Sequence, residues 1–199
     1  YPETRATHSS DLDRDLGIAL TQWPGVQQQR ALAEQALPLL ESSLKDWPND
    51  VAGLEAKGLA LRLADRPREA LQVFQACLSH APEDEFALLS AAETAAQLGQ
   101  LDAANAYFRH TIALNPWIPA YHLEYARVLM QCHEWSKACA ECKTGLRLDP
   151  MRLDLRQIQI ECLLRQGDNV QARKEFADLL RFQPSEEAAW RRWFLQRLQ

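Results

Sequence analysis

The sequence predicts an all-α protein built as an array of repeated helix pairs. The chain of 199 residues contains 31 Leu and 29 Ala but only 5 Val and 5 Ile. Leu and Ala lose little conformational entropy in a helix, whereas β-branched residues favour the pleated surface of a sheet. The second observation is a regular spacing of proline, and it favours an array over a single globule.

Five of the ten prolines recur with a period of 34 residues, namely Pro48, Pro82, Pro116, Pro150 and Pro184. Proline cannot continue a helix, and the residue before it is turned away from helical geometry. Each of these prolines is therefore expected to follow the end of a helix and to separate one unit from the next.

Small and large residues repeat in phase with the prolines. Twelve residues before each proline the sequence has Ala36, Ala70, Ala104, Ala138 and Ala172. Eight residues before each proline it has Leu40, Phe74, Phe108, Cys142 and Phe176. The alanines allow two helices to cross closely, and the large residue fills the space beside the crossing. Gly99 and Gly167, seventeen before a proline, are expected in the turn between the two helices.

This pattern resembles the tetratricopeptide repeat, a helix-turn-helix unit of 34 residues. The second unit carries the frame as Leu54, Gly58, Leu61, Ala70, Phe74 and Pro82. The resemblance implies a right-handed α-α superhelical solenoid, because one helix hairpin cannot bury its own apolar faces and neighbouring hairpins must stack.

The frame divides the chain into a short tail, five units and a cap. Residues 1–9 are expected to be a linker or a disordered tail. The units are 10–50, which is divergent because Pro24 stands where the other units have a helical residue, then 51–84, 85–118, 119–152 and 153–184. Residues 185–199 are expected to form a C-terminal capping helix that covers the last apolar surface and begins at Ser185 as N-cap.

The cysteines offer the most tempting chemical motif, but the frame favours packing. Cys139 and Cys142 form a CxxC pair, a spacing used in redox and zinc sites, and Lys143 stands where a haem-attachment motif has His. With Cys132 and His133 the pair could be imagined as a zinc site. However, the frame places Cys142 at a core position two turns away from Cys132. No metal, haem or other cofactor is therefore expected, and no arrangement of acids, bases or nucleophiles favours an enzyme.

The resemblance places a binding groove on the first helix of each unit. The positions of the family's groove correspond here to Glu55, Arg62, Phe86, Glu93, Gln97, Arg127, Gln131, Gln157, Glu161 and Arg165. Glu93, Arg127 and Glu161 recur at intervals of 34, so we expect them to form a Glu–Arg–Glu ladder. Two interpretations stay open. The acidic and basic side chains of the ladder neutralise one another, or Arg127 binds a carboxylate of a bound peptide.

The sequence therefore predicts a non-enzymatic scaffold that binds a protein or peptide in the concave groove, as one module of a larger chain. The alternatives are a weakly self-associating structural module, or an accessory region of an upstream catalytic or multihaem domain. A chaperone-tail adaptor is not expected, because the Lys, Asn and Arg residues of the EEVD-binding clamp are replaced by Glu55, Leu59, Ser90, Ala120 and Glu124.

Charge and hydropathy exclude two classes of partner. The net charge of −5 disfavours nucleic acid, and no apolar stretch approaches the roughly 20 residues needed to cross a bilayer. The free cysteines favour the cytoplasm. The chain begins without Met, so an upstream targeting segment is compatible with the sequence and the compartment stays unknown.

Overall fold

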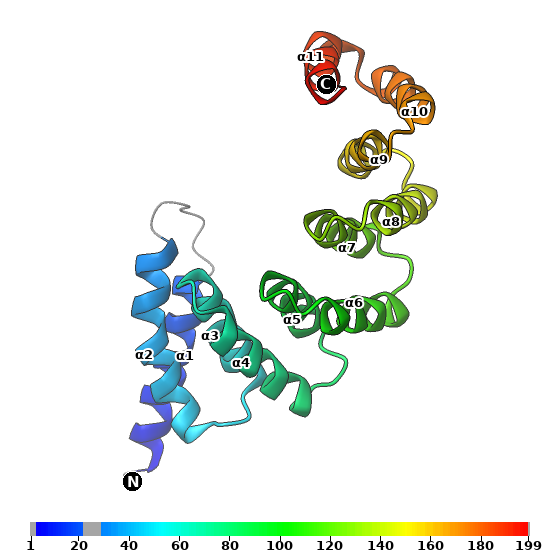
Figure 1. The fold of residues 1–199 in the computed structure, drawn as a ribbon. Helices are drawn as coiled ribbons and strands as arrows, with labels where there is room; N and C mark the ends of the chain where they lie inside the picture. The colour runs from blue at the N-terminus through cyan, green and yellow to red at the C-terminus, as the bar shows by residue number, and fades with distance from the viewer. Residues whose placement is uncertain (1–2, 22–28, 199) are drawn as a thin grey trace. The chain divides into compact units, whose positions relative to one another are not determined.

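The computed structural model describes residues 3–21 and 29–198, and this part of the chain is all-α, as the sequence predicts. The chain divides into two compact units, residues 1–111 (unit 1) and residues 112–199 (unit 2). Eleven α-helices and one short 3-10 turn account for the regular structure between these limits (Figure 1). No strand is present among the described residues.

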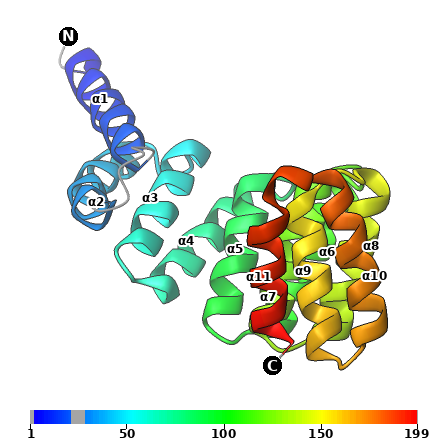
Figure 2. The ribbon, with the colours of Figure 1, turned by 90° about the horizontal axis from the view of Figure 1, so that it is seen from above.

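Helices α1 to α6 have the bounds Glu3–Thr21, Gln29–Asp46, Val51–Leu63, Pro67–His80, Glu85–Gln97 and Leu101–Leu114. Helices α7 to α11 have the bounds Pro119–Gln131, Trp135–Leu148, Leu153–Arg165, Asn169–Phe182 and Glu187–Arg197. The 3-10 turn Pro184–Glu186 precedes α11. In unit 1, α2 packs on α3, and α3 packs on α4. In unit 2, α7 and α8 pack together (Figure 1), as do α9 and α10 (Figure 2).

The periodic prolines end the second helix of each pair. Helices α2, α4, α6, α8 and α10 each stop two residues before one of the five prolines, at Asp46, His80, Leu114, Leu148 and Phe182. The gap of one non-helical residue is the effect expected of proline on its predecessor.

The turn between paired helices also repeats, and its backbone is left-handed in four consecutive units. Gly99 and Gly167 have φ of 74° and 78°, and Asp65 and His133, at the equivalent positions, have φ of 61°. The sequence predicts the two glycines; the other two residues adopt the same geometry because the turn requires it, although a side chain there is disfavoured.

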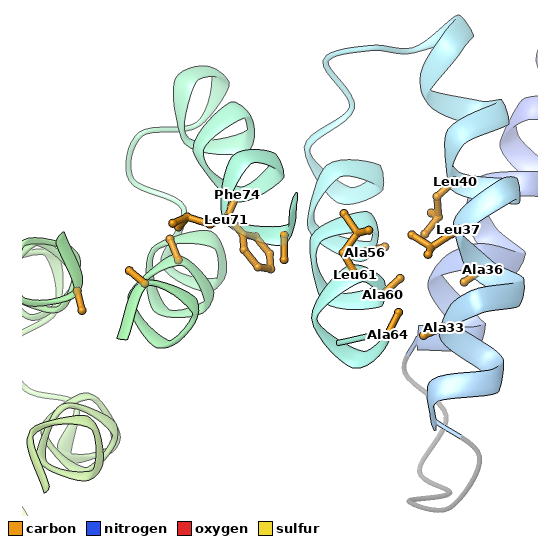
Figure 3. Packing of buried hydrophobic residues seen from close by; sticks show 14 residues of the cluster. Ala33, Ala36, Leu37, Leu40, Ala56, Ala60, Leu61, Ala64, Leu71 and Phe74 are labelled. Atoms are coloured by element: carbon orange, nitrogen blue, oxygen red, sulfur yellow. The ribbon is translucent and has the colours of Figure 1, made fainter. Parts of the chain in front are cut away.

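The repeated alanines and large residues form the core. All five alanines are at most 1% exposed, and Leu40, Phe74, Phe108 and Cys142 are completely buried. In unit 1, Ala33, Ala36, Leu37 and Leu40 of α2 lie in one cluster with Ala56, Ala60, Leu61 and Ala64 of α3 and with Phe74 of α4 (Figure 3). A Cβ on Gly58 would overlap the buried Phe74 ring, so the close crossing of α3 and α4 requires the glycine.

The ends of the array depart from the prediction. Residues 3–9, expected to be a linker or a disordered tail, belong to α1. They contain neither glycine nor proline and include the helix formers Glu3, Arg5 and Ala6, so nothing local interrupts a helix. The predicted break at Pro24 lies outside the described residues. The capping helix is present, but Glu186, rather than Ser185, is its N-cap, because the 3-10 turn precedes it.

We expect replacement of Asp65 by glycine to stabilise unit 1 by about 0.5–1 kcal/mol, because the substitution removes a side chain from a left-handed position. The free energy of local unfolding, measured by hydrogen exchange of the α3 and α4 amides, checks this.

Gly99→Ala is the matched opposite change and should destabilise the α5–α6 turn by about 1–2 kcal/mol. A Cβ at Gly99 meets no atom within 4 Å, so backbone strain is the cause under test. If Gly99→Ala left the stability unchanged and Asp65→Gly lowered it, the left-handed backbone would not be the cause of the strain in these turns.

Candidate functional site

In unit 1, five of the predicted groove residues lie on the first helices of two neighbouring pairs. Glu55 and Arg62 are on α3, and Phe86, Glu93 and Gln97 are on α5. A spacing of seven residues places Glu55 with Arg62, and Phe86 with Glu93, on one side of their helix. We call these five residues the binding face of unit 1.

An ion pair joins the two helices of this face. The Arg62 guanidinium donates a hydrogen bond to the Glu93 carboxylate, and the side chains are 27% and 36% exposed. Phe86 packs its ring edge against Phe74, with ring centroids 6.4 Å apart, and nevertheless remains 43% exposed. The face therefore combines a half-exposed aromatic ring with an ion pair, and Gln97 is exposed beyond them.

Glu55 has a high pKa for a carboxyl group. Burial raises the pKa of Glu55 to about 7, and a hydrogen bond with Asp84 and the negative charges of Asp84 and Asp50 act in the same direction. Asp84 is held in place because its Oδ1 accepts the Ala87 N–H, at 2.8 Å, as N-cap of α5. A carboxyl group with a pKa of about 7 thus lies at the edge of the binding face.

In unit 2, the other five predicted residues lie on α7 and α9. Arg127 and Gln131 are one turn apart on α7, and Gln157, Glu161 and Arg165 follow one another at intervals of four on α9. The two helices are in contact. Arg127, Gln131 and Arg165 are exposed, and Gln157 and Glu161 are half-buried. We call these five residues the binding face of unit 2.

The ion pairs on this face differ from the expected ladder. Arg127 Nη1 lies 2.8 Å from Glu124 Oε1, three residues away on the same helix. Glu161 Oε2 lies 3.4 Å from Arg197 Nε. The predicted pair of Arg127 with Glu161 is therefore wrong. Glu124, one turn away on α7, is within easier reach of Arg127 than Glu161 on α9. In unit 1, the equivalent Glu93 pairs with Arg62.

A second set of charges lies at the start of α9, close to Arg127. Arg152 Nη2 lies 2.6 Å from Asp154 Oδ2. The hydrogen bond from Arg152 is the main cause that lowers the pKa of Asp154, and the charge of Arg127 contributes as well. Arg127 thus pairs with Glu124 and contributes to the field at Asp154, so a ligand carboxylate must displace Glu124 to reach it.

Two further elements bring residues to this face that the predicted groove positions do not include. Arg197 of α11 reaches Glu161, and its guanidinium lies 4.7 Å from the centre of the Trp193 ring. The Arg165 guanidinium lies 5.9 Å from the centre of the Trp135 ring at the start of α8. The repeat frame does contain a signal for these residues of α11. The capping helix takes the place of the first helix of a sixth unit, so the groove positions of the frame can be extended onto it.

The cysteines are built into the core. Cys139, Cys142 and Cys162 are buried, and Cys132 is half-buried. Burial raises the pKa of Cys142, and it raises the pKa of Cys162 to about 12 and that of Cys77 to about 11. Thiols with such pKa values are poor nucleophiles. Among the described residues, no three or more His, Cys, Asp or Glu side chains gather as a metal site.

Similar solved structures decide the fold. MamA from Desulfovibrio magneticus RS-1 superposes with a TM-score of 0.75 at 18% identity, over 90% of this chain and 97% of that one. The fold is that of the tetratricopeptide-repeat proteins. TTC0263, a thermophilic TPR protein in Thermus thermophilus, matches with a TM-score of 0.64 at 21% identity, over 95% and 98% of the two chains.

A third structure, YrrB, is described as a TPR protein with an unusual peptide-binding site. It matches with a TM-score of 0.63 at 16% identity, over 76% of this chain and 78% of that one. No family model matches the sequence, and no curated protein matches it. None of the helices within the described ranges is long and apolar enough to cross a bilayer.

We expect Glu55→Gln to stabilise unit 1 at pH 8 and to leave its stability nearly unchanged at pH 4.5. The pKa of Glu55 is raised in the folded state, so the stability associated with the protonated form is present at low pH and is lost as the pH rises through about 7. The amide cannot ionise and still donates to Asp84. Because the side chain is partly exposed, the gain at pH 8 should stay below about 1 kcal/mol.

Hydrogen exchange of the α3 and α5 amides at the two pH values measures this difference. Glu83→Gln, in the exposed turn before Asp84, is the control and should show equal effects at both. An equal effect of Glu55→Gln at both pH values would mean that the pKa of Glu55 is not raised in the folded chain.

Proposed function

We propose that this chain is a non-enzymatic scaffold that binds an extended peptide or a protein segment on the first helices of its repeats. The tetratricopeptide-repeat fold supports this proposal, because a stack of helix pairs presents equivalent positions of successive first helices along one surface. The peptide-binding site named for YrrB supports it by analogy of fold.

The observation that carries the proposal is that Arg127 can exchange its partner Glu124 for a carboxylate of a ligand. Its side chain is 50% exposed, and its partner Glu124 is 31% exposed. An exposed pair within one helix contributes only about 0.3–0.5 kcal/mol. A ligand carboxylate that meets the guanidinium with two parallel hydrogen bonds is held more strongly, and it can displace Glu124 at little cost.

The charges and rings of the two faces indicate the chemistry of the ligand. Arg127 and Arg165 favour an acidic residue on the face of unit 2. On the face of unit 1, the half-exposed Phe86 favours an apolar residue, which would cover the part of its ring that Phe74 leaves open. We therefore propose that the face of unit 2 binds segments that carry an acidic side chain and that the face of unit 1 binds segments that carry an apolar one.

We expect Arg127→Glu to weaken peptide binding at least tenfold, because one charge-assisted hydrogen-bonding site is lost and replaced by a repelling charge. The probe is a peptide selected from a random library on the wild-type chain, and the dissociation constant is measured by fluorescence anisotropy. Thermal stability should change little, since Arg127 is exposed.

Arg181→Glu is the matched control. Arg181 is 79% exposed on α10 and also pairs with an acid three residues away, Asp178, so the substitution changes the net charge equally. Its dissociation constant should remain within twofold of the wild type. Equal losses in the two variants would indicate nonspecific attraction, and an unchanged constant for Arg127→Glu would remove the proposed face.

A further inference from the structure

The C-terminal end of unit 2 contains an open apolar pocket of about 320 Å³ between α10 and α11. Its apolar lining consists of Phe176, Ala177, Leu180, Phe194, Leu195 and Leu198. One arginine stands on each wall, Arg173 on α10 and Arg191 on α11. The pocket is thus an apolar depression with a cation on both sides.

The capping helix covers the core without closing this pocket. Phe194 stacks on Phe176, with ring centroids 4.3 Å apart and an interplanar angle of 12°, and is buried by the contact. Leu195, the next residue, is 61% exposed at the pocket. The exposed leucine and the apolar lining of the pocket together offer a place for an apolar side chain of another element.

Helix α1 in unit 1 has a surface of matching shape and opposite charge. Leu12 and Leu16 lie one turn apart and are 69% and 53% exposed. At 100° per residue, Asp13 lies on one side of this leucine pair and Asp15 on the other. The helix therefore presents two apolar side chains flanked by one carboxylate on each side. Asp15 also pairs through Oδ1 with Arg14 of the same helix, at 3.0 Å, and its second oxygen can accept a further donor.

We propose that the α10–α11 pocket of one copy binds helix α1 of a second copy. Leu12 and Leu16 enter the apolar depression and cover Leu195, and Asp13 and Asp15 meet the arginines on the two walls. Arg191 already pairs with Glu187 at 2.6 Å, but a guanidinium has five N–H donors and can serve both acids.

The contact joins two different surfaces, so each copy leaves one pocket and one α1 helix available for further copies. Such a head-to-tail contact builds open chains of copies unless the rotation between them closes a ring. A single helix in a small pocket buries less surface than a stable dimer interface, so we expect association at micromolar to millimolar concentration.

Sedimentation velocity of the purified chain from about 1 µM to about 500 µM tests the proposal. The sedimentation coefficient of the wild type should increase with concentration, whereas Leu195→Glu and Leu12→Glu should remain monomeric. Val170→Glu, at an 83% exposed position of α10 outside the pocket, should associate like the wild type. Circular dichroism checks that each variant is folded.

Charge exchange provides the decisive measurement. Arg173→Glu/Arg191→Glu gives an acidic pocket that repels its own α1, and Asp13→Arg/Asp15→Arg gives a basic α1 that repels its own pocket. Each double variant alone should be monomeric. Their equimolar mixture should associate again, because each pocket then meets an α1 helix of opposite charge.

A wild type that is monomeric at every concentration overturns the proposal. Association of the Leu195→Glu variant also overturns it, because that result would point to α1–α1 contacts. A mixture of the two double variants that remains monomeric overturns it as well. Arg127→Glu does not alter the pocket or α1 and should leave self-association unchanged, so this proposal and the proposed peptide binding are tested independently.

Discussion

The close crossing of the two helices within each pair is the constraint on which the other features depend. An alanine twelve residues before each proline allows the backbones to approach, and a large residue eight before the proline fills the space beside them. If a larger side chain replaced the alanine, the helices would separate and the buried ring would lose its contacts. The positions of the turn, of the next helix and of its exposed side chains all follow from this crossing.

Residues that obey the repeat could be predicted from the sequence, because one physical requirement acts on them five times. Ala36 and its four equivalents are all buried, and all five periodic prolines follow helix ends. The expectation of a linker fails at residues 3–9, which belong to α1, because it relied on the start of the repeat frame alone. The frame says nothing about a helix that extends beyond it.

The side chains of the binding faces were harder to predict, because their partners depend on reach and on neighbouring elements. A spacing of 34 placed Arg127 and Glu161 at equivalent positions, but a long flexible side chain pairs with the nearest acid, and Glu124 on the same helix is nearer. Arg197 meets Glu161 only because α11 folds back beside α9. Sequence periodicity therefore predicts the position of a residue on its helix, whereas packing decides where the charged end of its side chain lies.

The raised pKa of Glu55 has a consequence for the thermodynamics of binding. A Lys or Arg of a ligand placed beside Glu55 would favour the ionised carboxylate, and the proton would pass to the solvent. Near neutral pH, the heat measured on mixing would then include the ionisation heat of the buffer and would differ between phosphate and Tris. A ligand held only on the face of unit 2 would give the same heat in both, so proton release distinguishes which helices a ligand covers.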